Sequence, residues 1–265
     1  KLKKIIIKVN PEIIFHFAAQ SLVGKSFDKY EETYKTNIIG TLNVLKCVKE
    51  IKNIKTCLIT TTDKVYENLK KKNKMYSENE NLKGSNPYSG SKVAKENLIY
   101  SFAKSLLNNK NIIIVRSGNV IGGGDWSSSR LIPDIVNSFI NGKKFIMRNP
   151  THTRPWQHIF DVLSTYLKLV KKIHKKRKFL DYFNVSFHNN KQRSVKEIVK
   201  IFKKDKLFER IKILRSKNKK YEEDQFLNIS NKKIKKFISI KSQFSSLEDS
   251  IKNVISWYNV YLSNK

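Results

Sequence analysis

Long apolar runs and cysteines are both scarce in this sequence of 265 residues. No uninterrupted apolar run approaches the ~20 residues of a membrane span, and no signal peptide is visible. We therefore expect a cytoplasmic protein without a membrane segment. The two cysteines, Cys47 and Cys57, lie on or beside apolar segments and match no metal-ligand spacing. They indicate buried thiols in a reducing compartment and no metal site.

Acidic residues are also few, with 22 Asp and Glu against 54 Lys and Arg, which gives a formal net charge of +32. This charge raises the possibility of a nucleic-acid-binding protein. A surface of that kind clusters arginine and aromatic residues along one face. Here only eight of the basic residues are arginine, and the lysines are scattered over most of the chain. We therefore expect no nucleic-acid partner and attribute the lysines to a compositional bias.

The arginines have a more selective distribution. None precedes Arg116, and four fall between Arg116 and Arg154. In a chain that otherwise takes lysine for positive charge, the rigid guanidinium suggests positions where geometry matters, such as phosphate binding. A structural ion pair is the alternative for Arg116 and for Arg148.

The apolar patterning predicts an α/β protein, either one core or one core with a smaller lobe. Its alternation of strands and helices is typical of a parallel sheet. Strands are expected at 13–20, 57–59, 112–115, 145–148 and 183–187. Helices are expected at 1–10, 27–52, 88–107, 131–136, 195–202 and 246–258. Residues 203–241 are lysine-dense and indicate solvated faces of the smaller lobe. His16, inside the first apolar run, is interpreted as a hydrogen-bonded core histidine.

The most informative spacing is that of Tyr88 and Lys92, which a helix places on one face. An ammonium held beside a phenol favours the phenolate. Such a pair can take a proton from a hydroxyl while hydride leaves the same carbon. The spacing alone is weak evidence in a lysine-rich chain. Its context strengthens it, because a strand ending in Thr62, Asp63 and Lys64 precedes the helix and another strand follows it, as in a βαβ unit.

Two further segments carry small or polar residues where packing residues are usual. Asn37 lies near the middle of the helix expected at 27–52, and it suits a buried asparagine that supports a water molecule near the site. A helix-to-helix contact at Gly40 is the alternative. The three glycines Gly122 to Gly124 have no phosphate-loop spacing, and they indicate a substrate-side loop.

Five motifs in chain order resemble the CDP-glucose 4,6-dehydratases, a branch of the extended short-chain dehydrogenase/reductase family. The motifs are Phe15-His16-x-Ala18-Ala19-Gln20, Thr62-Asp63-Lys64-x-Tyr66-Glu67-Asn68, the run from Gly118 to Trp126, Arg130-Leu131-Ile132-Pro133-Asp134, and Arg154-Pro155-Trp156-Gln157-His158. The resemblance runs from about residue 11 to the carboxyl end. Lys64 discriminates, because the related dTDP-glucose enzymes have glutamate there.

The resemblance implies an NAD-dependent enzyme that dehydrates a nucleotide sugar, CDP-glucose, to the 4-keto-6-deoxy sugar of deoxysugar and O-antigen biosynthesis. Tyr88, with Lys92 and Thr62, takes the O4 proton while hydride leaves C4. Asp63 is the acid at the C6 hydroxyl and Lys64 the base at C5.

The same resemblance implies binding residues. Contacts to NAD fall to Ala18, Ala19, Gln20, Asn37, Thr60, Tyr88, Lys92 and Ser117. Contacts to the nucleotide sugar fall to Asn119, Trp126, Arg130, Arg154 and Trp156, of which Arg154 and Arg130 hold the diphosphate. The two tryptophans are open to a second interpretation, as core residues.

The implied fold is a Rossmann-type doubly wound parallel sheet with a smaller mixed α/β lobe. Residues 1–116, joined by 150–198, form the NAD-binding core, and 117–265 mostly form the substrate lobe. No glycine precedes Gly24, so the first strand, glycine turn and helix of such a fold are missing. We interpret the chain as amino-terminally truncated; that it never had the motif is the alternative.

Several functional alternatives stay open at this point. An epimerase or reductase of the same family would act on a nucleotide sugar without dehydration. An inactive remnant, or a basic binding module, would show no turnover. The resemblance also implies a homo-oligomer, a dimer or tetramer, with dimerisation through the helices at 27–52 and 88–107.

Overall fold

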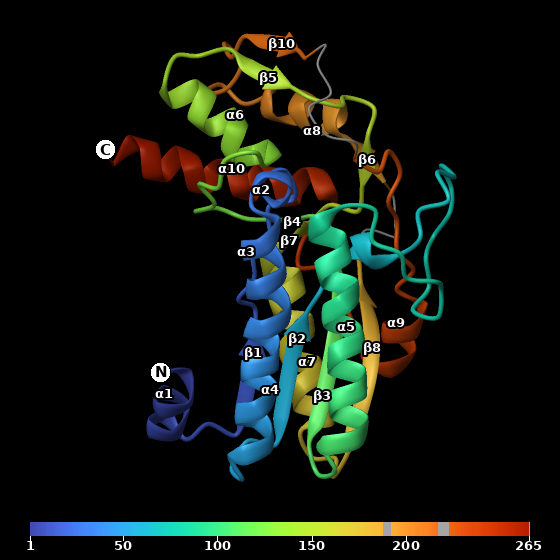
Figure 1. The fold of residues 1–265 in the computed structure, drawn as a ribbon. Coiled ribbons are helices and arrows are strands. Elements are labelled where there is room, and N and C mark those ends of the chain that lie inside the picture. Colours follow the sequence, from blue (N-terminus) through green and yellow to red (C-terminus); the bar gives the residue numbers. More distant parts are fainter. Residues whose placement is uncertain (188–191, 217–222, 265) are drawn as a thin grey trace.

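The computed structural model describes residues 1–187, 192–216 and 223–264. Its centre is a sheet of four parallel strands in the order β1-β2-β3-β8 (Figure 1). Each strand overlaps one of the runs expected to form the sheet, which confirms the α/β fold, although β8 begins four residues before the expected range. The strands are β1 (Ile13–His16), β2 (Thr56–Thr60), β3 (Asn111–Ser117) and β8 (Phe179–Val185).

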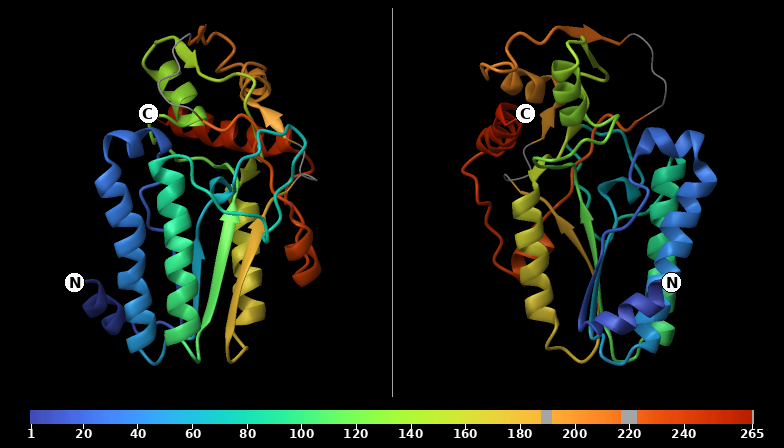
Figure 2. Two further views of the ribbon diagram at one scale, coloured as in Figure 1. Left: turned by 45° about the vertical axis from the view of Figure 1, so that its right-hand side comes forward. Right: turned by 90° about the vertical axis from the view of Figure 1, so that its left-hand side faces the viewer.

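Successive side chains along a strand point to opposite faces of the sheet, and each face packs against its own apolar cluster. Ile112 and Ile114 of β3 face one apolar cluster, which contains residues of α4 and α5. Ile113 and Val115 face another, which contains residues of α7. Figure 2 shows the helices in layers on the two sides of the sheet. The bounds are α4 (Gly40–Glu50), α5 (Pro87–Leu106) and α7 (Ile159–Ile173).

The single helix expected at 27–52 is wrong in detail. The chain forms four helical segments there: α2 (Val23–Asp28), α3 (Tyr30–Tyr34), the π-helix η1 (Lys35–Ile39) and α4. Lys29 interrupts the first two with φ −126°. The wider π turn adds a residue to the helix around Asn37, a feature frequent at functional sites. Among the described residues no atom outside the helix's own backbone lies within 4 Å of a Cβ built on Gly40, so they make no helix contact there.

A second lobe lies above the carboxyl ends of the strands, with its own apolar core (Figure 1). Ser194 caps α8 as expected, because its side chain accepts a hydrogen bond from the Glu197 amide. The lobe's elements are β4 (Val120–Ile121), α6 (Leu131–Ile140), β5 (Phe145–Met147), β6 (Thr153–Arg154), β7 (Gln157–His158), β9 (Arg193–Ser194), α8 (Val195–Phe202), β10 (Ile213–Arg215) and α10 (Leu247–Ser263).

The glycine run before Trp126 joins this lobe to its terminal helix. A Cβ on Gly123 would lie 2.2 Å from the ring of Trp257, so only glycine permits this approach. Gly122 alone of the three lines the cavity below the lobe. The loop expected on the substrate side therefore also packs on α10.

Residues 203–241 divide between the two lobes. Phe208 and Ile211 enter the core of the upper lobe. Helix α9 (Lys232–Phe237) instead packs on β8, and Ile234 is fully buried in the sheet cluster. The expectation that this stretch only supplies solvated faces of the smaller lobe is wrong for α9, because its apolar residues complete the sheet's core. Residues 217–222 and 188–191 lie outside the described residues.

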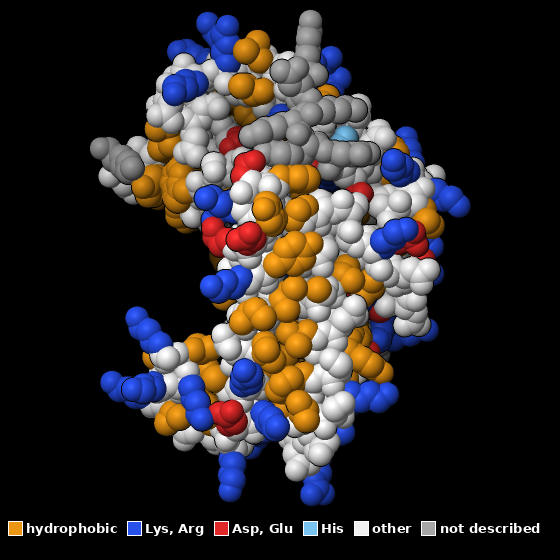
Figure 3. Space-filling model, viewed as in Figure 1, with side chains coloured by type: hydrophobic (Ala, Val, Ile, Leu, Met, Phe, Trp, Pro, Cys, Tyr) orange, Lys and Arg blue, Asp and Glu red, His pale blue; other side chains and the backbone are white. Residues whose placement is uncertain are grey.

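The amino-terminal helix α1 (Leu2–Val9) forms as expected and ends at Asn10, which adopts a left-handed conformation with φ 48°. Cys47 and Cys57 are buried free thiols, as the sequence indicated. Lysine and arginine side chains are spread over the face drawn in Figure 3. Within the described chain, no helix has both the length and the apolarity required to cross a bilayer.

Candidate active site

A cavity of about 370 Å³ lies where the strand ends of the sheet meet the upper lobe. This is the edge at which open α/β sheets bind ligands. Residues from both lobes line the cavity. The sheet lobe contributes Thr62, Asp63, Lys64 and Tyr88, and the upper lobe contributes Asn119, Arg130, Arg148, Arg154 and Trp156, among others.

The segment after β2 holds three of the predicted catalytic residues. It turns into a short 3-10 helix, η2 (Asp63–Val65), and the Thr62 hydroxyl caps that helix by accepting the Lys64 amide at 3.3 Å. Asp63 is 1% exposed, and its Oδ1 lies 3.3 Å from Lys64 Nζ. Its Oδ2 is buried with no hydrogen-bond partner among the described residues. A bound hydroxyl could satisfy that oxygen.

Helix α5 brings the other two catalytic residues to this segment. A capping box of Asn86 and Ser89, with Pro87 in the first turn, fixes the start of the helix. Tyr88 follows in that turn, and its phenol hydrogen-bonds Thr62. Lys92 lies one turn on, with Nζ 5.6 Å from the centroid of the Tyr88 ring. The structure therefore brings together all five predicted catalytic residues.

The electrostatics of Tyr88 differ from expectation. Burial raises the pKa of Tyr88 to about 12, while the hydrogen bond with Thr62 lowers it. Burial also lowers the pKa of Lys92 to about 8, against the carboxylate of Glu96, which raises it. The phenol is thus protonated in this resting arrangement. The expected lowering of its pKa is wrong here, because desolvation of the phenolate outweighs nearby positive charge.

The predicted cofactor contacts lie at the carboxyl ends of the strands. Ala18 is exposed and Ala19 half-buried just after β1, while Thr60 and Ser117 end β2 and β3. Small side chains at these ends leave space for a flat cofactor against the backbone. Lys92 Nζ makes no hydrogen bond to any residue in the described part of the chain, although the side chain is 3% exposed. Its N–H groups are available for hydroxyl acceptors.

Asn37 supports this edge through the backbone. Its Oδ1 accepts the Gln20 amide at 2.9 Å, and its Nδ2 donates to the Gln20 carbonyl at 3.0 Å and to Ser91 Oγ at 2.9 Å. Asn37 is fully buried, as expected, and it ties the chain after β1 to helix α5.

The predicted substrate residues are divided. Asn119, Arg130, Arg154 and Trp156 line the cavity. Arg154 is buried and donates to the carbonyls of Thr153 and Gln225 at 2.8 and 3.3 Å. Arg130 bridges the lobes, because it binds Asp125 Oδ2 at 2.9 Å and Ser21 Oγ at 2.8 Å. Trp156 Nε1 donates to the Arg193 carbonyl at 2.9 Å.

Trp126 is not among the residues that line the cavity. Its ring packs on the aromatic side of α10, at 5.3 Å from the Tyr258 ring and 6.4 Å from the Trp257 ring. This position fits the second interpretation of Trp126, as a packing residue.

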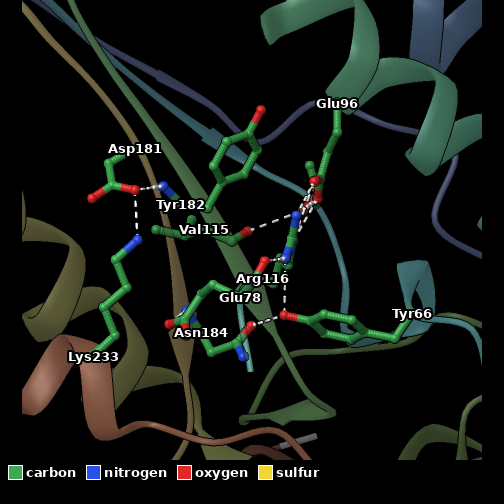
Figure 4. A network of polar contacts seen from close by, with 10 residues as sticks. Tyr66, Glu78, Glu96, Val115, Arg116, Asp181, Tyr182, Asn184 and Lys233 are labelled. Carbon is green, nitrogen blue, oxygen red and sulfur yellow. Dashed lines mark hydrogen bonds and ion pairs between the residues drawn. The ribbon is translucent and has the colours of Figure 1, made fainter. Parts of the chain in front are cut away.

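Sequence reasoning missed a buried polar network beside the catalytic segment (Figure 4). Arg116 forms an ion pair with Glu96 and a hydrogen bond with Tyr66. For Arg116 the structural ion pair is therefore the correct alternative, and phosphate binding is wrong. The sequence did offer one indication of a buried charge network, because Glu96 follows Lys92 by four residues on the same helix.

Two buried basic residues lie beneath the site. His16 Nε2 lies 2.9 Å from Thr41 Oγ1, which confirms the core interpretation. Burial lowers the pKa of His16 to about 3, and the positive charges of Lys95 and Lys92 lower it further. Lys95 is fully buried and donates to the Thr60 carbonyl at 3.1 Å. Burial lowers its pKa well below the ordinary value.

No metal site accompanies these groups within 1–187, 192–216 and 223–264: no three His, Cys, Asp or Glu residues are placed to share an ion. The chemistry available in the cavity is that of a phenol, an amine, a carboxyl and a hydroxyl, with the Lys92 ammonium beside the phenol.

Comparison with known sequences gives matches over most of the chain. A family model described as GDP-mannose 4,6 dehydratase matches residues 1–252. CDP-glucose 4,6-dehydratase of Salmonella typhimurium is 41% identical over 207 residues, which are 75% of this chain and 57% of that protein. dTDP-D-glucose 4,6-dehydratase of Dictyostelium discoideum is 30% identical over 181 residues, 64% of this chain and 41% of that protein. The chain thus spans about half the length of these relatives.

Solved structures share the fold at low sequence identity. dTDP-glucose 4,6-dehydratase of Bacillus anthracis, solved in complex with NAD, has a TM-score of 0.77 and 23% identity, with 98% of this chain and 76% of that chain covered. UDP-glucuronic acid 4-epimerase of Bacillus cereus, in complex with UDP-glucuronic acid and NAD, has a TM-score of 0.83 and 19% identity, with 98% and 79% covered.

Proposed function

Because this chain belongs to the GDP-mannose 4,6 dehydratase family, we propose that it acts on a nucleotide sugar and removes water from CDP-glucose, giving CDP-4-keto-6-deoxyglucose. One observation carries the proposal. Thr62, Asp63, Lys64 and Tyr88 line one cavity, so the proposed base of the oxidation, Tyr88, faces the same space as the proposed acid and base of the elimination, Asp63 and Lys64. CDP-glucose is chosen because a CDP-glucose 4,6-dehydratase is 41% identical over three quarters of the chain.

The residues at the strand ends fit NAD as the cofactor. Ala18, Ala19 and the backbone of Gln20 border its place, with Thr60 and Ser117 at the neighbouring strand ends and Asn37 bracing Gln20. Tyr88 and Lys92 supply hydroxyl and ammonium donors for the nicotinamide end. When bound, NAD would supply the hydride acceptor for oxidation at C4 and the hydride donor for reduction at C6.

In the oxidation step, Tyr88 removes the proton of the sugar O4 hydroxyl. The resting pKa of Tyr88, about 12, is too high for a strong base at neutral pH. A hydroxyl chain through Thr62 and the ammonium of Lys92 stabilises the phenolate as it forms. These residues therefore act as a unit, in which Tyr88 holds the proton and the other two lower the cost of removing it.

In the elimination step, Asp63 protonates the departing C6 hydroxyl and Lys64 removes the C5 proton. An acid and a base are needed together, so the carboxyl must be neutral and the amine must be neutral. The ion pair at 3.3 Å differs from that form by one proton transfer within the pair. Lys64 then returns its proton to C5 as hydride arrives at C6.

The diphosphate of the substrate is assigned to Arg154, with Arg130 beside it. Both line the cavity, and guanidinium groups suit phosphate oxygens. Asn119 and Trp156 border the same space and shape the sugar and nucleotide pocket.

The enzyme is proposed to work as a homo-oligomer in the cytoplasm. The face made by α3, η1 and α5 carries apolar side chains that are 39 to 53% exposed, and orange side chains gather on that face in Figure 3. They are Tyr30, Tyr34, Ile39, Tyr100 and Leu106. A second copy would bury them. A monomeric mass in light scattering would refute this part of the proposal.

The test is product analysis. The protein expressed from the reading frame that contains this chain is incubated with NAD and, separately, CDP-glucose, dTDP-glucose and UDP-glucose. Mass spectrometry should show the loss of one water from CDP-glucose in preference to the other two. A 4-epimer or a reduced sugar without loss of water would support an epimerase or reductase, and no product from any sugar would support an inactive remnant.

A further inference from the structure

The catalytic segment 62–64 is bordered by a buried ion pair that does not itself line the cavity. Glu96 of α5 and Arg116 of β3 are 1% and 2% exposed. Arg116 Nε lies 3.0 and 3.2 Å from the two carboxylate oxygens, and Nη2 lies 2.5 Å from Oε2. This two-pronged geometry fixes the orientation of both side chains.

The ion pair reaches the catalytic segment from both ends. Thr61, the residue before it, donates from Oγ1 to Glu96 Oε1 at 2.6 Å. Tyr66, just after the 3-10 turn, accepts Arg116 Nη1 at 2.9 Å and donates to Asn184 Oδ1 at 2.6 Å. Figure 4 shows Tyr66, Arg116 and Glu96 pointing toward one another. The segment between Thr61 and Tyr66 is therefore spanned by one charged bridge.

The same bridge also acts on Lys92, the partner of Tyr88 in the oxidation step. Glu96 lies one helical turn after Lys92, on the same face of α5. Its carboxylate opposes the effect of burial and raises the pKa of Lys92. Loss of the carboxylate would leave Lys92 with a weaker preference for its charged form.

We propose that Glu96 and Arg116 are positioning residues that hold Asp63 and Lys64 in their elimination geometry through Thr61 and Tyr66. The inference rests on the proposed function, because it assigns the elimination step to that segment. A buried ion pair alone is weak evidence of a functional role. The two hydrogen-bonded arms to residues flanking the catalytic segment are what distinguish this one.

Tyr66→Phe tests the bridge with a small change. The variant keeps the ring, which stacks on Tyr76 at 5.2 Å, and removes only the hydroxyl. Tyr76→Phe is the matched control: Tyr76 is also 2% exposed, and its hydroxyl accepts the Leu69 amide at 2.8 Å, outside the bridge. Thr61→Val removes the hydrogen bond from residue 61 to Glu96, and Thr61→Ser should keep it.

We expect Tyr66→Phe and Thr61→Val to lower kcat by roughly tenfold or more with KM little changed, since small misplacements of reacting groups are costly. Elimination should slow relative to C4 oxidation. The reduced nicotinamide should therefore accumulate during turnover and be visible by its near-ultraviolet absorbance. Tyr76→Phe and Thr61→Ser should show neither effect. Equal behaviour of Tyr66→Phe and Tyr76→Phe would overturn the proposal.

A second readout does not need activity. Hydrogen exchange of the amides at 61–66 should speed up in Tyr66→Phe and Thr61→Val and stay unchanged in Tyr76→Phe. Unchanged exchange in all three would refute the bridge even if the wild type is inactive. Wild-type protein without dehydration product but with the expected exchange pattern would refute the proposed function alone.

Discussion

Asp63 Oδ1 lies 3.3 Å from Lys64 Nζ, while Asp63 Oδ2 is buried and has no hydrogen-bond partner among the described residues. One oxygen thus holds the neighbouring amine, and the other is left for a ligand in the cavity. This arrangement suits a carboxyl that gives a proton to a substrate hydroxyl while its partner amine takes one from carbon.

Asp63→Asn should abolish dehydration and spare the oxidation. The amide has nearly the same shape but cannot act as the acid, so we expect kcat to fall by about 10² to 10⁴. The reduced nicotinamide should form in a single turnover and persist. Stopped-flow absorbance measures it. Asp181→Asn is the control, because Asp181 also pairs with a lysine, Lys233, away from the cavity. A variant within a few-fold of wild type would remove Asp63 from the mechanism.

Tyr88→Phe should abolish both oxidation and dehydration, because the proton of O4 has no acceptor. No reduced nicotinamide should form on addition of the sugar. Tyr100→Phe provides a close control on the same helix: Lys104 lies over the Tyr100 ring at 5.4 Å with the same spacing, but Tyr100 is 44% exposed. Tyr100→Phe keeps the apolar ring on the proposed oligomer face, so its activity should equal that of the wild type. Normal turnover by Tyr88→Phe would exclude Tyr88 as the base.

Asn86→Ala should affect stability and activity together. Loss of an N-cap side chain costs about 1 kcal/mol of unfolding free energy, and the first turn of α5 carries Tyr88. Ser194→Ala removes an equivalent capping box from α8, which carries none of the predicted catalytic residues. Chemical denaturation should show a similar loss for both variants. Only Asn86→Ala should lower kcat, and an equal effect on kcat would argue against positioning by this cap.

The stability of the protein should fall in acid partly because of His16. Its pKa is about 3 in the folded chain and near 6.5 when unfolded, so the unfolded state takes up the proton first. The free energy of unfolding should fall by up to about 1.4 kcal/mol per pH unit between these values. His16→Gln lacks this component. Urea titrations from pH 7 to pH 4 should therefore show the two proteins converging as pH falls, and parallel curves would contradict the assignment.

The central strands of the sheet were predictable from the sequence because β2 and β3 contain continuous apolar runs, as parallel strands buried on both faces require. Strand β8 was located only in part, because Asp181 and Asn184 interrupt its apolar residues. The meeting of Tyr88 with Lys92 was predictable for a local reason, since helix geometry alone sets it. The arrival of Thr62, Asp63 and Lys64 beside them follows from the strand-to-helix connection, which places both at one edge of the sheet.

Features that depend on distant contacts were not predictable. Arg116 and Glu96 are 20 residues apart and meet only when β3 packs beside α5. The apolar residues of α9 were hidden within a lysine-dense stretch, and their partner, β8, lies about 50 residues earlier. The raised pKa of Tyr88 depends on burial of the phenol, which a spacing argument does not contain.

The central claim is that hydrogen moves from C4 to C6 of one sugar within one active site. The most direct measurement uses CDP-glucose carrying deuterium at C4, with NMR and mass analysis of the product. The account predicts a 4-keto-6-deoxy sugar with deuterium in its C6 methyl group. Deuterium retained at C4 of an epimer, or a product methyl group without deuterium, would contradict it.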